Sequence, residues 1–476
     1  MIAVLVVAVA LFLPAPAHAA ATRPLETAIS AVDPFHGPAA GLAFARTRAA
    51  GAGAVVLHVS WRDTAPAGAT RPSGFNPSDP ADPAYRWEVF DRLVTLAAGQ
   101  GLAPIVHVSA APEWAERGGG GRAGINSPDP AELGHFAEAA ARRYSGTFGG
   151  LPRVRAWEVW SEPNASFALQ PQRRRGRDAS PELYRRMVNA FADAVHQVHA
   201  DNQVIAGGLF PFVIDRPGGI SIGPLRFMRS MLCLTRKLRP RRRCTEPARF
   251  DIWSHHPYTS GGPTHRAGHR DAVSIRELPR MRRVLAAGVR RGRVISAGPV
   301  RFWVTEFGWD SRPPDPHGVP ARLHARWVAE ALYRMWRAGV TLVAWFQLRD
   351  DARGGQPYSR SAQSGLYIRC AAGPACDRPK PALAAFRFPF VAFRAGARVA
   401  VWGRSPDANA LVDVEQRWGG AWRTVARLRS NGHGIFVRRL RSTRRGPLRA
   451  RVVAGGAHAL PFSLSRPRDR TVNPFG

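Results

Sequence analysis

Lysine is almost absent from this sequence of 476 residues. Only Lys237 and Lys380 are lysines, yet lysine and arginine together number 68 against 34 acidic residues, for a net charge of +34. Such a charge is compatible with a polyanionic partner such as nucleic acid, anionic lipid or acidic polysaccharide. However, the arginines are spread along the whole chain, and no nucleic-acid-binding motif accompanies them. We therefore favour a compositional bias towards arginine and expect no specific nucleic-acid partner.

Cysteine is also scarce. The four cysteines form two close pairs in the sequence, Cys233 with Cys244 and Cys370 with Cys376. Their spacings do not suit a structural zinc site. Of the three pairings that four cysteines allow, we expect these two local disulfides, provided that the protein is exported.

Long apolar runs are missing beyond the amino terminus. The first segment, MIAVLVVAVALFLPAPAHAA (1–20), is apolar and then passes through prolines to an Ala-His-Ala pattern. This is typical of a signal peptide, although the usual basic segment is lacking. The alternative, an uncleaved anchor, is disfavoured because the run is short for a membrane span. We expect cleavage, a secreted or cell-wall-associated protein, and no transmembrane segment in the mature chain.

From about residue 25 to 390 the sequence alternates regularly between strand-like and helix-like segments. Eight short apolar, β-branched or aromatic runs read as buried strands: 27–35, 54–61, 103–110, 154–160, 203–210, 249–258, 301–309 and 341–348. Helical patterns lie between them, among them 85–101, 130–146, 180–199 and 320–340. Eight such repeats predict an α/β fold, a (β/α)₈ TIM barrel over 25–390. A doubly wound open sheet is the alternative, but the glycine-rich turn that it favours after the first strand is missing.

The texture changes after about residue 390. Short alternating segments separated by Gly, Pro and Asn turns predict a small β-sandwich domain over 391–470. Such a domain could bind glycan or a cell-wall partner, or it could simply cap the barrel. The sequence does not choose between these roles.

Two glutamates end predicted strands of the barrel. Glu162 lies in WEVWSEPN (157–164) after the fourth strand, and Glu306 lies in FWVTEFGW (302–309) after the seventh. Functional groups of such barrels cluster where strands end, and these strands lie across the barrel mouth from each other. Two carboxylates that face one cleft are the equipment of glycosidic bond hydrolysis. By contrast, we expect Glu158, deeper in the same strand, to pair with a buried arginine.

These motifs resemble glycoside hydrolase clan A, the retaining (β/α)₈-barrel glycosidases that include families 39 and 5. The resemblance covers about residues 25 to 390 as a pattern, with specific motifs on strands four, six and seven. It implies that Glu162 is the general acid/base and that Glu306 is the nucleophile. The chain is then expected to be a secreted retaining glycosidase that cleaves a poly- or oligosaccharide by double displacement.

The resemblance also suggests residues that bind substrate. We expect Tyr258 to hold Glu306 by a hydrogen bond and His256 to contact a sugar or a carboxylate, with ordinary packing as the alternative. Trp345 matches the place where the clan stacks an aromatic ring against the sugar. Trp114 and Trp309, after strands three and seven, are candidates to extend the cleft.

Two positions depart from the clan pattern. Ser161 stands where the clan usually has an asparagine that hydrogen-bonds the sugar 2-hydroxyl, and serine is too short for the same contact. The second strand lacks the arginine that many members carry and offers only His58. Ser161 therefore keeps an alternative open, a catalytically weak or inactive carbohydrate-binding barrel.

No pattern calls for a metal or a cofactor, and we expect none. His265 and His269 are four residues apart, but they lie in a Gly/Pro-containing loop without a third ligand in sight. The partner that we expect is a carbohydrate substrate, with an acidic glycan as one option. That option rests on position, because the arginine run at 173–175, with Arg177, follows strand four on the expected catalytic face.

Overall fold

The computed structural model describes residues 23–118, 123–216, 219–244, 246–441, 444–465, 467 and 470–472. The predicted signal peptide (1–20) lies outside the described residues. Within them, no helix is both long and apolar enough to cross a lipid bilayer.

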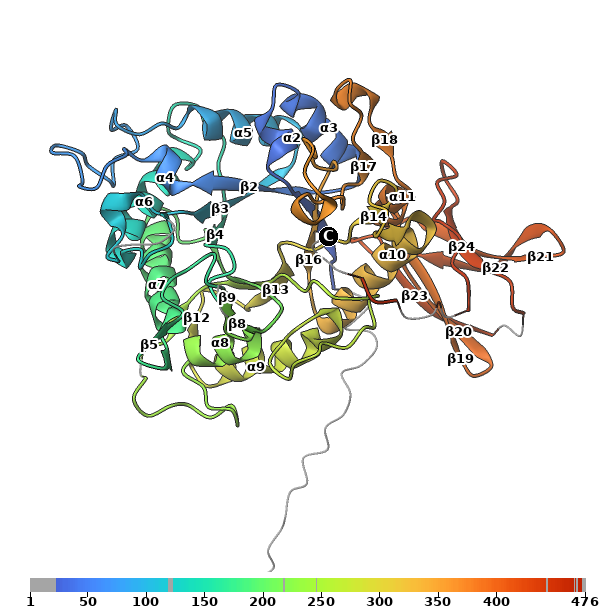
Figure 1. Cartoon of the computed structure of the whole chain (residues 1–476). Coiled ribbons are helices and arrows are strands. Elements are labelled where there is room, and N and C mark those ends of the chain that lie inside the picture. The colour runs from blue at the N-terminus through green and yellow to red at the C-terminus, as the bar shows by residue number, and fades with distance from the viewer. Residues whose placement is uncertain are drawn as a thin grey trace, which may run out of the picture.

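Eight parallel strands close into a barrel, as the alternating texture predicts (Figure 1). Around the barrel the order is β1-β2-β3-β4-β7-β11-β13-β16, and β16 pairs back onto β1. The strands are β1 (Glu26–Ser30), β2 (Ala54–Ser60), β3 (Ala103–Ser109), β4 (Ala156–Val159), β7 (Gln203–Leu209), β11 (Ile252–His255), β13 (Arg301–Val304) and β16 (Leu342–Phe346). Each of the eight apolar runs in the sequence overlaps one of them, so the predicted barrel is confirmed.

Helices follow the strands and form the outer ring seen down the barrel axis in Figure 1. The principal helices are α3 (Ala40–Ala49), α5 (Glu88–Gly99), α6 (Pro130–Arg143), α7 (Ser180–Val198), α8 (Pro224–Met231), α9 (Leu278–Arg290), α10 (Ala321–Ala338) and α11 (Pro381–Arg387). Asp129 caps α6 by accepting the Ala131 amide, and Gly339 ends α10 in the left-handed conformation at φ 97°. The start and stop signals in the sequence are therefore used as expected.

Short elements occupy the connections. Two further helical turns are α2 (Asp33–His36) and α4 (Trp61–Thr64). Two-residue or three-residue strands pair locally: β5 (Arg173–Arg174) with β6 (Arg177–Asp178), β8 (Ile214–Arg216) with β9 (Gly219–Ser221), β10 (Ala248–Arg249) with β12 (Val294–Ile295), β14 (Ser311–Arg312) with β15 (Val319–Pro320), and β17 (Tyr367–Ile368) with β18 (Arg378–Pro379). The 3₁₀ turns are η1 (Glu113–Ala115), η2 (Ile275–Glu277), η3 (Tyr358–Arg360) and η4 (Pro374–Cys376).

The barrel interior has its own apolar core. One cluster of buried side chains draws on all eight strands and is separate from the larger core around it: Ala28, Ala54, Val56, Ile105, Ala156, Ile205, Ile252, Trp303, Leu342 and Ala344. Because side chains alternate along a strand, these positions fix which residues of each strand point inward. The next inward positions towards the strand ends must then lie one layer nearer the mouth.

The carboxy-terminal strands form two antiparallel sheets of three strands each, in the orders β19-β20-β23 and β22-β21-β24. Their bounds are β19 (Phe390–Ala395), β20 (Arg398–Arg404), β21 (Leu411–Trp418), β22 (Ala421–Arg429), β23 (Ile435–Arg441) and β24 (Leu448–Val452). This β-rich domain lies beside the barrel against α10 (Figure 1). Tyr333 of α10 stacks on Phe393, and Trp336 of α10 packs against Trp402. The predicted barrel followed by a β-rich domain is therefore confirmed.

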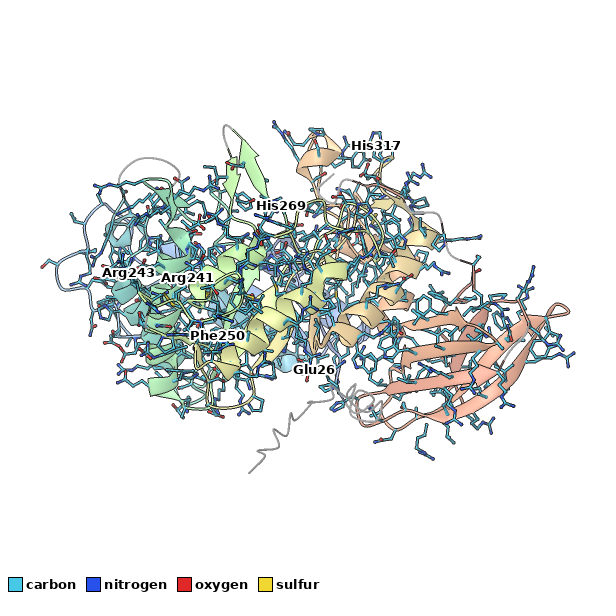
Figure 2. The ribbon with its side chains drawn as sticks, turned by 90° about the horizontal axis from the view of Figure 1, so that it is seen from below. Glu26, Arg241, Arg243, Phe250, His269 and His317 are labelled. Atoms are coloured by element: carbon cyan, nitrogen blue, oxygen red, sulfur yellow. A yellow bond between two sulfur atoms is a disulfide. The ribbon has the colours of Figure 1, made fainter. Side chains whose placement is uncertain are left out.

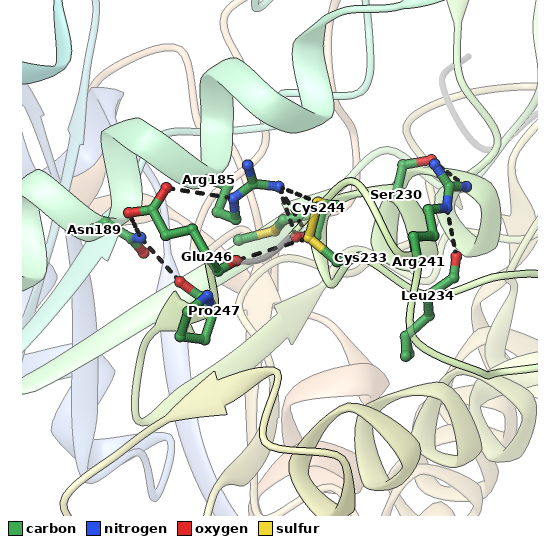
Figure 3. The surroundings of a disulfide bond; sticks show 10 residues. Arg185, Asn189, Ser230, Cys233, Leu234, Arg241, Cys244, Glu246 and Pro247 are labelled. Carbon is green, nitrogen blue, oxygen red and sulfur yellow. Dashed lines mark hydrogen bonds and ion pairs between the residues drawn. A yellow bond between two sulfur atoms is a disulfide. The ribbon is translucent and has the colours of Figure 1, made fainter.

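Both expected disulfides are present, Cys233–Cys244 and Cys370–Cys376. The first closes the loop between α8 and β10, and Figure 3 shows its surroundings. Arg185 of α7 reaches this bridge, with Nη1 3.3 Å from the sulfur of Cys233 and 3.2 Å from that of Cys244. The bridge thus ties a loop without regular structure to a barrel helix.

Candidate active site at the carboxyl end of the barrel

The strand ends converge on one face of the barrel. Figure 2 shows His269 and His317, from loops that follow β11 and β13, on the side of the barrel opposite Glu26, where β1 begins. Glu162 comes three residues after the end of β4 and Glu306 two residues after the end of β13. Both glutamates are half-buried on that face.

A layer of polar side chains lies above the apolar interior core. Its members occupy the inward positions next along their strands, and all but the half-buried His58 are buried: Ser30, His58, His107, Glu158, Ser254 and Thr305. Hydrogen bonds link them, including Ser30 to His58 at 3.1 Å and Ser254 to Glu158 at 2.8 Å. We call these six residues the polar layer.

Glu158 is the centre of the polar layer, and here the sequence prediction was wrong. No arginine among the described residues pairs with it. Instead its carboxylate accepts hydrogen bonds from His107 Nδ1 (3.1 Å), Ser254 Oγ (2.8 Å) and Thr305 Oγ1 (2.6 Å). Burial favours the neutral acid, but the hydrogen bond and charge of His107 prevail and lower the pKa of Glu158. Glu158 is therefore held as a carboxylate beneath the mouth.

His58 takes the place where the clan resemblance implied an arginine. Burial and the neighbouring His107 ring, 4.9 Å away between centroids, lower the pKa of His58 to about 3. The side chain is thus neutral at ordinary pH. Unlike an arginine, it brings no positive charge to the floor of the site.

The backbone conformation of Glu162 is supported by the end of β7. Glu162 has φ 47°, in the left-handed region that residues other than glycine seldom occupy, and its amide donates to the Gly208 carbonyl at 2.9 Å. Gly207 must be glycine, because its φ is 117° and a Cβ would lie 2.2 Å from the Ser254 carbonyl oxygen. The close approach of β7 to β11 therefore supports the turn that presents Glu162.

His256 is the direct partner of Glu162. Its Nδ1 lies 3.1 Å from Glu162 Oε1, and its Nε2 lies 3.3 Å from Thr305 Oγ1, so it joins Glu162 to the polar layer. Burial opposes the charged imidazolium, but the charges of Glu306 and Glu162 outweigh it and raise the pKa of His256 to about 9. The expected contact between His256 and a carboxylate is present.

The pKa of Glu162 is raised above its usual value. Burial raises the pKa of its carboxyl, the hydrogen bond from His256 opposes that change, and the negative charge of Glu306 raises the pKa further. Glu306 therefore lies near enough for its charge to act on the Glu162 carboxyl. A carboxyl with a raised pKa beside a second carboxylate is the arrangement in which one group can donate a proton while the other stays ionised.

Tyr258 anchors Glu306. Its hydroxyl donates to Glu306 Oε1 at 2.7 Å, which is the hydrogen bond that the sequence resemblance implied. Burial and the charge of Glu306 raise the pKa of Tyr258 well above its usual value, so the hydroxyl remains a donor. The nucleophile candidate is thereby held in one orientation.

Ser161 and Asn164 flank the acid/base candidate. Ser161 is half-buried beside Glu162. Asn164 is fully buried and clasps two loops: its amide donates to the carbonyls of Phe210 and Ile222 at 2.9 Å each, and its oxygen accepts the Phe210 amide at 2.8 Å. Asn164 is a supporting residue that the sequence reading missed, although it directly follows the Glu-Pro pair.

The expected sugar platform at Trp345 was wrong. Its side chain is 1% exposed, its indole donates to the Ser364 carbonyl, and its ring packs against Phe307 and Phe386. Trp345 therefore points outward to the helices. Alternation from Leu342 and Ala344 places Phe346 inward instead, and Phe346 is only half-buried at the strand end.

The other two tryptophans also pack with aromatic neighbours. Trp309 is fully buried, with its indole donating to the Gly261 carbonyl at 3.0 Å, so its expected role in the cleft is wrong as well. Trp114, in η1 after β3, is half-buried and donates to the Pro66 carbonyl at 2.9 Å. A contact between Trp114 and substrate remains a prediction.

The arginine run lies in a hairpin on the same face. Arg173 and Arg174 form β5, and Arg177 belongs to β6, in the connection between β4 and α7. Arg174 and Arg177 are exposed, whereas Arg173 lies 3.5 Å from Asp215. The steering of an acidic glycan by this hairpin remains a prediction.

His265 and His269 line a cavity of about 450 Å³ together with Arg266 and Ser260. Within the described part of the chain, no three His, Cys, Asp or Glu side chains are grouped so that they could hold a metal ion.

Comparison with known proteins shows which solved structures have a similar fold. No family model matches the sequence, and no curated protein matches it. Among solved structures, a family 39 glycoside hydrolase from the gut symbiont Bacteroides cellulosilyticus WH2 is similar at 16% identity and a TM-score of 0.52, over 88% of this chain and 79% of that one. The GH39 enzyme from Xanthomonas axonopodis pv. citri is similar at 15% identity and a TM-score of 0.51, over 89% and 94% of the two chains. The chain thus has the fold of family 39 glycoside hydrolases, in agreement with the clan A resemblance in its sequence.

Proposed function

We propose that the protein is a secreted retaining glycoside hydrolase that cleaves O-glycosidic bonds of a poly- or oligosaccharide. One observation carries this proposal: Glu162, whose pKa is raised, shares the barrel mouth with Glu306, whose carboxylate is anchored by Tyr258. Paired carboxyl groups with separate tasks are the basis of glycoside hydrolysis. The fold shared with family 39 enzymes supports the same reaction class.

In the first step Glu306 attacks the anomeric carbon, and Glu162 donates its proton to the departing glycosidic oxygen. The bond from the anomeric carbon to that oxygen breaks while a bond to Glu306 forms. The hydrogen bond from Tyr258 keeps one carboxylate oxygen of Glu306 engaged, so the other is free to attack. Burial of Glu162 helps it to remain protonated until this step.

His256 can stabilise the carboxylate that forms when Glu162 loses its proton. With a pKa of about 9, the imidazole is positively charged at neutral pH and lies 3.1 Å from the carboxylate that the step creates. A charge-assisted hydrogen bond at that atom stabilises the product of proton transfer. His256 is thus a positioning residue that tunes Glu162, and Glu158 holds the other side of the network through Thr305.

In the second step Glu162 acts as a base. It takes a proton from water, the resulting hydroxide oxygen attacks the anomeric carbon, and Glu306 leaves as a carboxylate. The sugar is released with its original anomeric configuration. The two disulfides are compatible with the secreted location that the amino-terminal sequence predicts.

The proposal is tested by incubating the protein with a panel of aryl β-glycosides and following the products by proton NMR. We expect turnover of at least one sugar, with the β-anomer appearing first, and nearly complete loss of activity in Glu306→Gln. First appearance of the α-anomer would contradict the retaining mechanism. Saturable glycan binding without turnover would instead indicate the inactive carbohydrate-binding barrel that Ser161 leaves open.

A further inference from the structure

A second cavity, of about 620 Å³, opens in the carboxy-terminal β-rich domain. Its lining includes Arg398 at the start of β20, Arg441 at the end of β23, Arg444, and Trp418 of β21. No acidic residue is among the described residues that line it. The volume falls within the range of about 300–1,000 Å³ that is typical of small-ligand sites.

Two of the arginines face each other across a strand pair. Arg398 and Arg441 are direct partners in the antiparallel ladder between β20 and β23, and both are exposed. Like charges directly opposite each other destabilise a sheet. An anion bound between them would remove that repulsion, so the unliganded pair is prepared for a negative group.

The third arginine is held in place by the tryptophan. The Arg444 guanidinium lies over the Trp418 ring at 4.5 Å from the ring centroid. Stacking on an aromatic face orients a guanidinium and leaves its in-plane N–H groups free to meet a carboxylate in a bidentate manner. Trp418 therefore positions a donor towards the cavity rather than presenting its own bare face.

Three arginines of the carboxy-terminal β-rich domain, Arg427, Arg449 and Arg451, pair with acidic residues. The sandwich strands contain two acidic residues, Asp413 and Glu415, both on β21. Asp413 pairs with Arg427 at 2.7 Å, and Glu415 pairs with Arg449 at 2.7 Å. Arg398, Arg441 and Arg444, in contrast, make no ion pair with any residue that the structure describes. The cavity thus brings together three arginines that have no acidic partner among the described residues.

We propose that this cavity binds the carboxylate of a uronic-acid unit in an acidic glycan, and so tethers the glycan beside the barrel. The choice of a glycan rests on the proposed glycosidase function. A single-stranded nucleic acid is disfavoured because such ligands are bound by successive stacked aromatic rings, whereas this cavity offers one ring that Arg444 already covers.

Binding is measured by calorimetric titration of the full-length protein with an oligouronate and with its methyl-esterified, uncharged counterpart. All proteins in the titration carry Glu306→Gln, which prevents turnover. The test variant is Arg398→Gln/Arg441→Gln. The control is Arg438→Gln/Arg439→Gln, which removes the same charge from exposed positions of β23 outside the cavity lining.

We expect the oligouronate to bind and its ester to bind at least tenfold more weakly. The cavity variant should lose affinity for the oligouronate tenfold or more, while the control loses less than threefold. Because the variant relieves a like-charge pair, its melting temperature without ligand should equal or exceed that of the parent. Trp418→Leu, which releases Arg444, should weaken oligouronate binding as well.

Equal losses in the two double variants would mean diffuse charge attraction and would overturn the proposal. Equal affinity for the ester would overturn it too, as would tighter binding of a single-stranded oligonucleotide that depends on Arg398 and Arg441. The glycosidase proposal is tested independently of the cavity proposal. If the protein binds the oligouronate through the cavity but turns over no glycoside, the glycosidase proposal alone is refuted. Turnover by the unmodified protein without such binding would refute the cavity site alone.

Discussion

The contact between His256 and Glu162 gives a sharp pH prediction. Replacing His256 with Asn removes an imidazolium whose Nδ1 lies 3.1 Å from Glu162 Oε1 and whose pKa is about 9. A hydrogen bond between charged groups contributes about 1.5–3 kcal/mol, and one pKa unit corresponds to about 1.4 kcal/mol. The pKa of Glu162 should therefore rise by about one to two units in His256→Asn.

The sign follows from the role of Glu162. As the general acid it must be protonated, so activity falls as pH rises through its pKa, which sets the alkaline limb of kcat/KM. Loss of the positive partner disfavours the carboxylate, so the alkaline limb should move to higher pH by about one to two units. The assay is kcat/KM for an aryl glycoside with a poor leaving group, measured across pH.

The neighbouring histidine provides a matched control. His255 is buried, donates from Nε2 to the Val273 carbonyl (2.8 Å), and is neutral because burial lowers its pKa to about 3. His255→Asn should leave the alkaline limb in place even if it lowers stability. An unmoved or lowered limb in His256→Asn would refute the assignment of Glu162 as the acid tuned by His256.

Four further substitutions test other parts of the site. Phe346→Ala should raise KM in steady-state kinetics with little loss of stability. Trp345→Ala should instead lower the free energy of unfolding by about 3–5 kcal/mol in urea unfolding, with little change in KM. The reverse pattern would contradict the inward placement of Phe346. Glu158→Ala leaves three buried donors without their acceptor and should lower the free energy of unfolding by about 3 kcal/mol or more, measured by urea unfolding. A loss below about 0.5 kcal/mol, the size typical of exposed positions, would contradict the polar layer. Ser161→Asn should raise kcat about fivefold to a hundredfold on a 2-hydroxy glycoside, because it adds a hydrogen bond of about 1–3 kcal/mol. If serine makes room for a 2-acetamido group, the same substitution should lower activity on a 2-acetamido glycoside. No change on either substrate would mean that residue 161 does not contact the substituent at carbon two.

The strand–helix order was predictable because it depends on local patterns. Every barrel strand carries a compact apolar run, and Asp129 and Gly339 mark a helix start and a helix end by capping chemistry that acts over a few residues. The same regularity placed Glu162 and Glu306 at strand ends. A barrel then brings those ends together without further information from the sequence.

The inward face of the last strand was not predictable in the same way. In LVAWF (342–346) both faces are buried, so no polar residue marks which side meets the barrel interior. Once Leu342 and Ala344 are known to point inward, Trp345 must point outward and Phe346 inward. That register depends on closure of the whole barrel, which a single run of apolar residues does not reveal.

The polar layer left a signal that the sequence reading did not use. His58, His107, Ser254 and Thr305 are each a polar residue two positions after an inward apolar one. A recurring polar position near the ends of several buried strands indicates a shared layer, and such a layer supplies the partners of Glu158. The raised pKa of Glu162, by contrast, depends on its burial and on distances to His256 and Glu306, which follow β11 and β13, and it needs the folded chain.

We propose that Glu306 is the nucleophile of a retaining glycosidase. This proposal is tested most directly by incubating the protein with activated 2-deoxy-2-fluoro glycosides and analysing the digest by mass spectrometry. We expect a covalent sugar on the peptide that contains Glu306, with loss of activity in step with labelling. Turnover of the parent glycoside without any labelled enzyme, or a sugar attached to Glu162 instead, would contradict it.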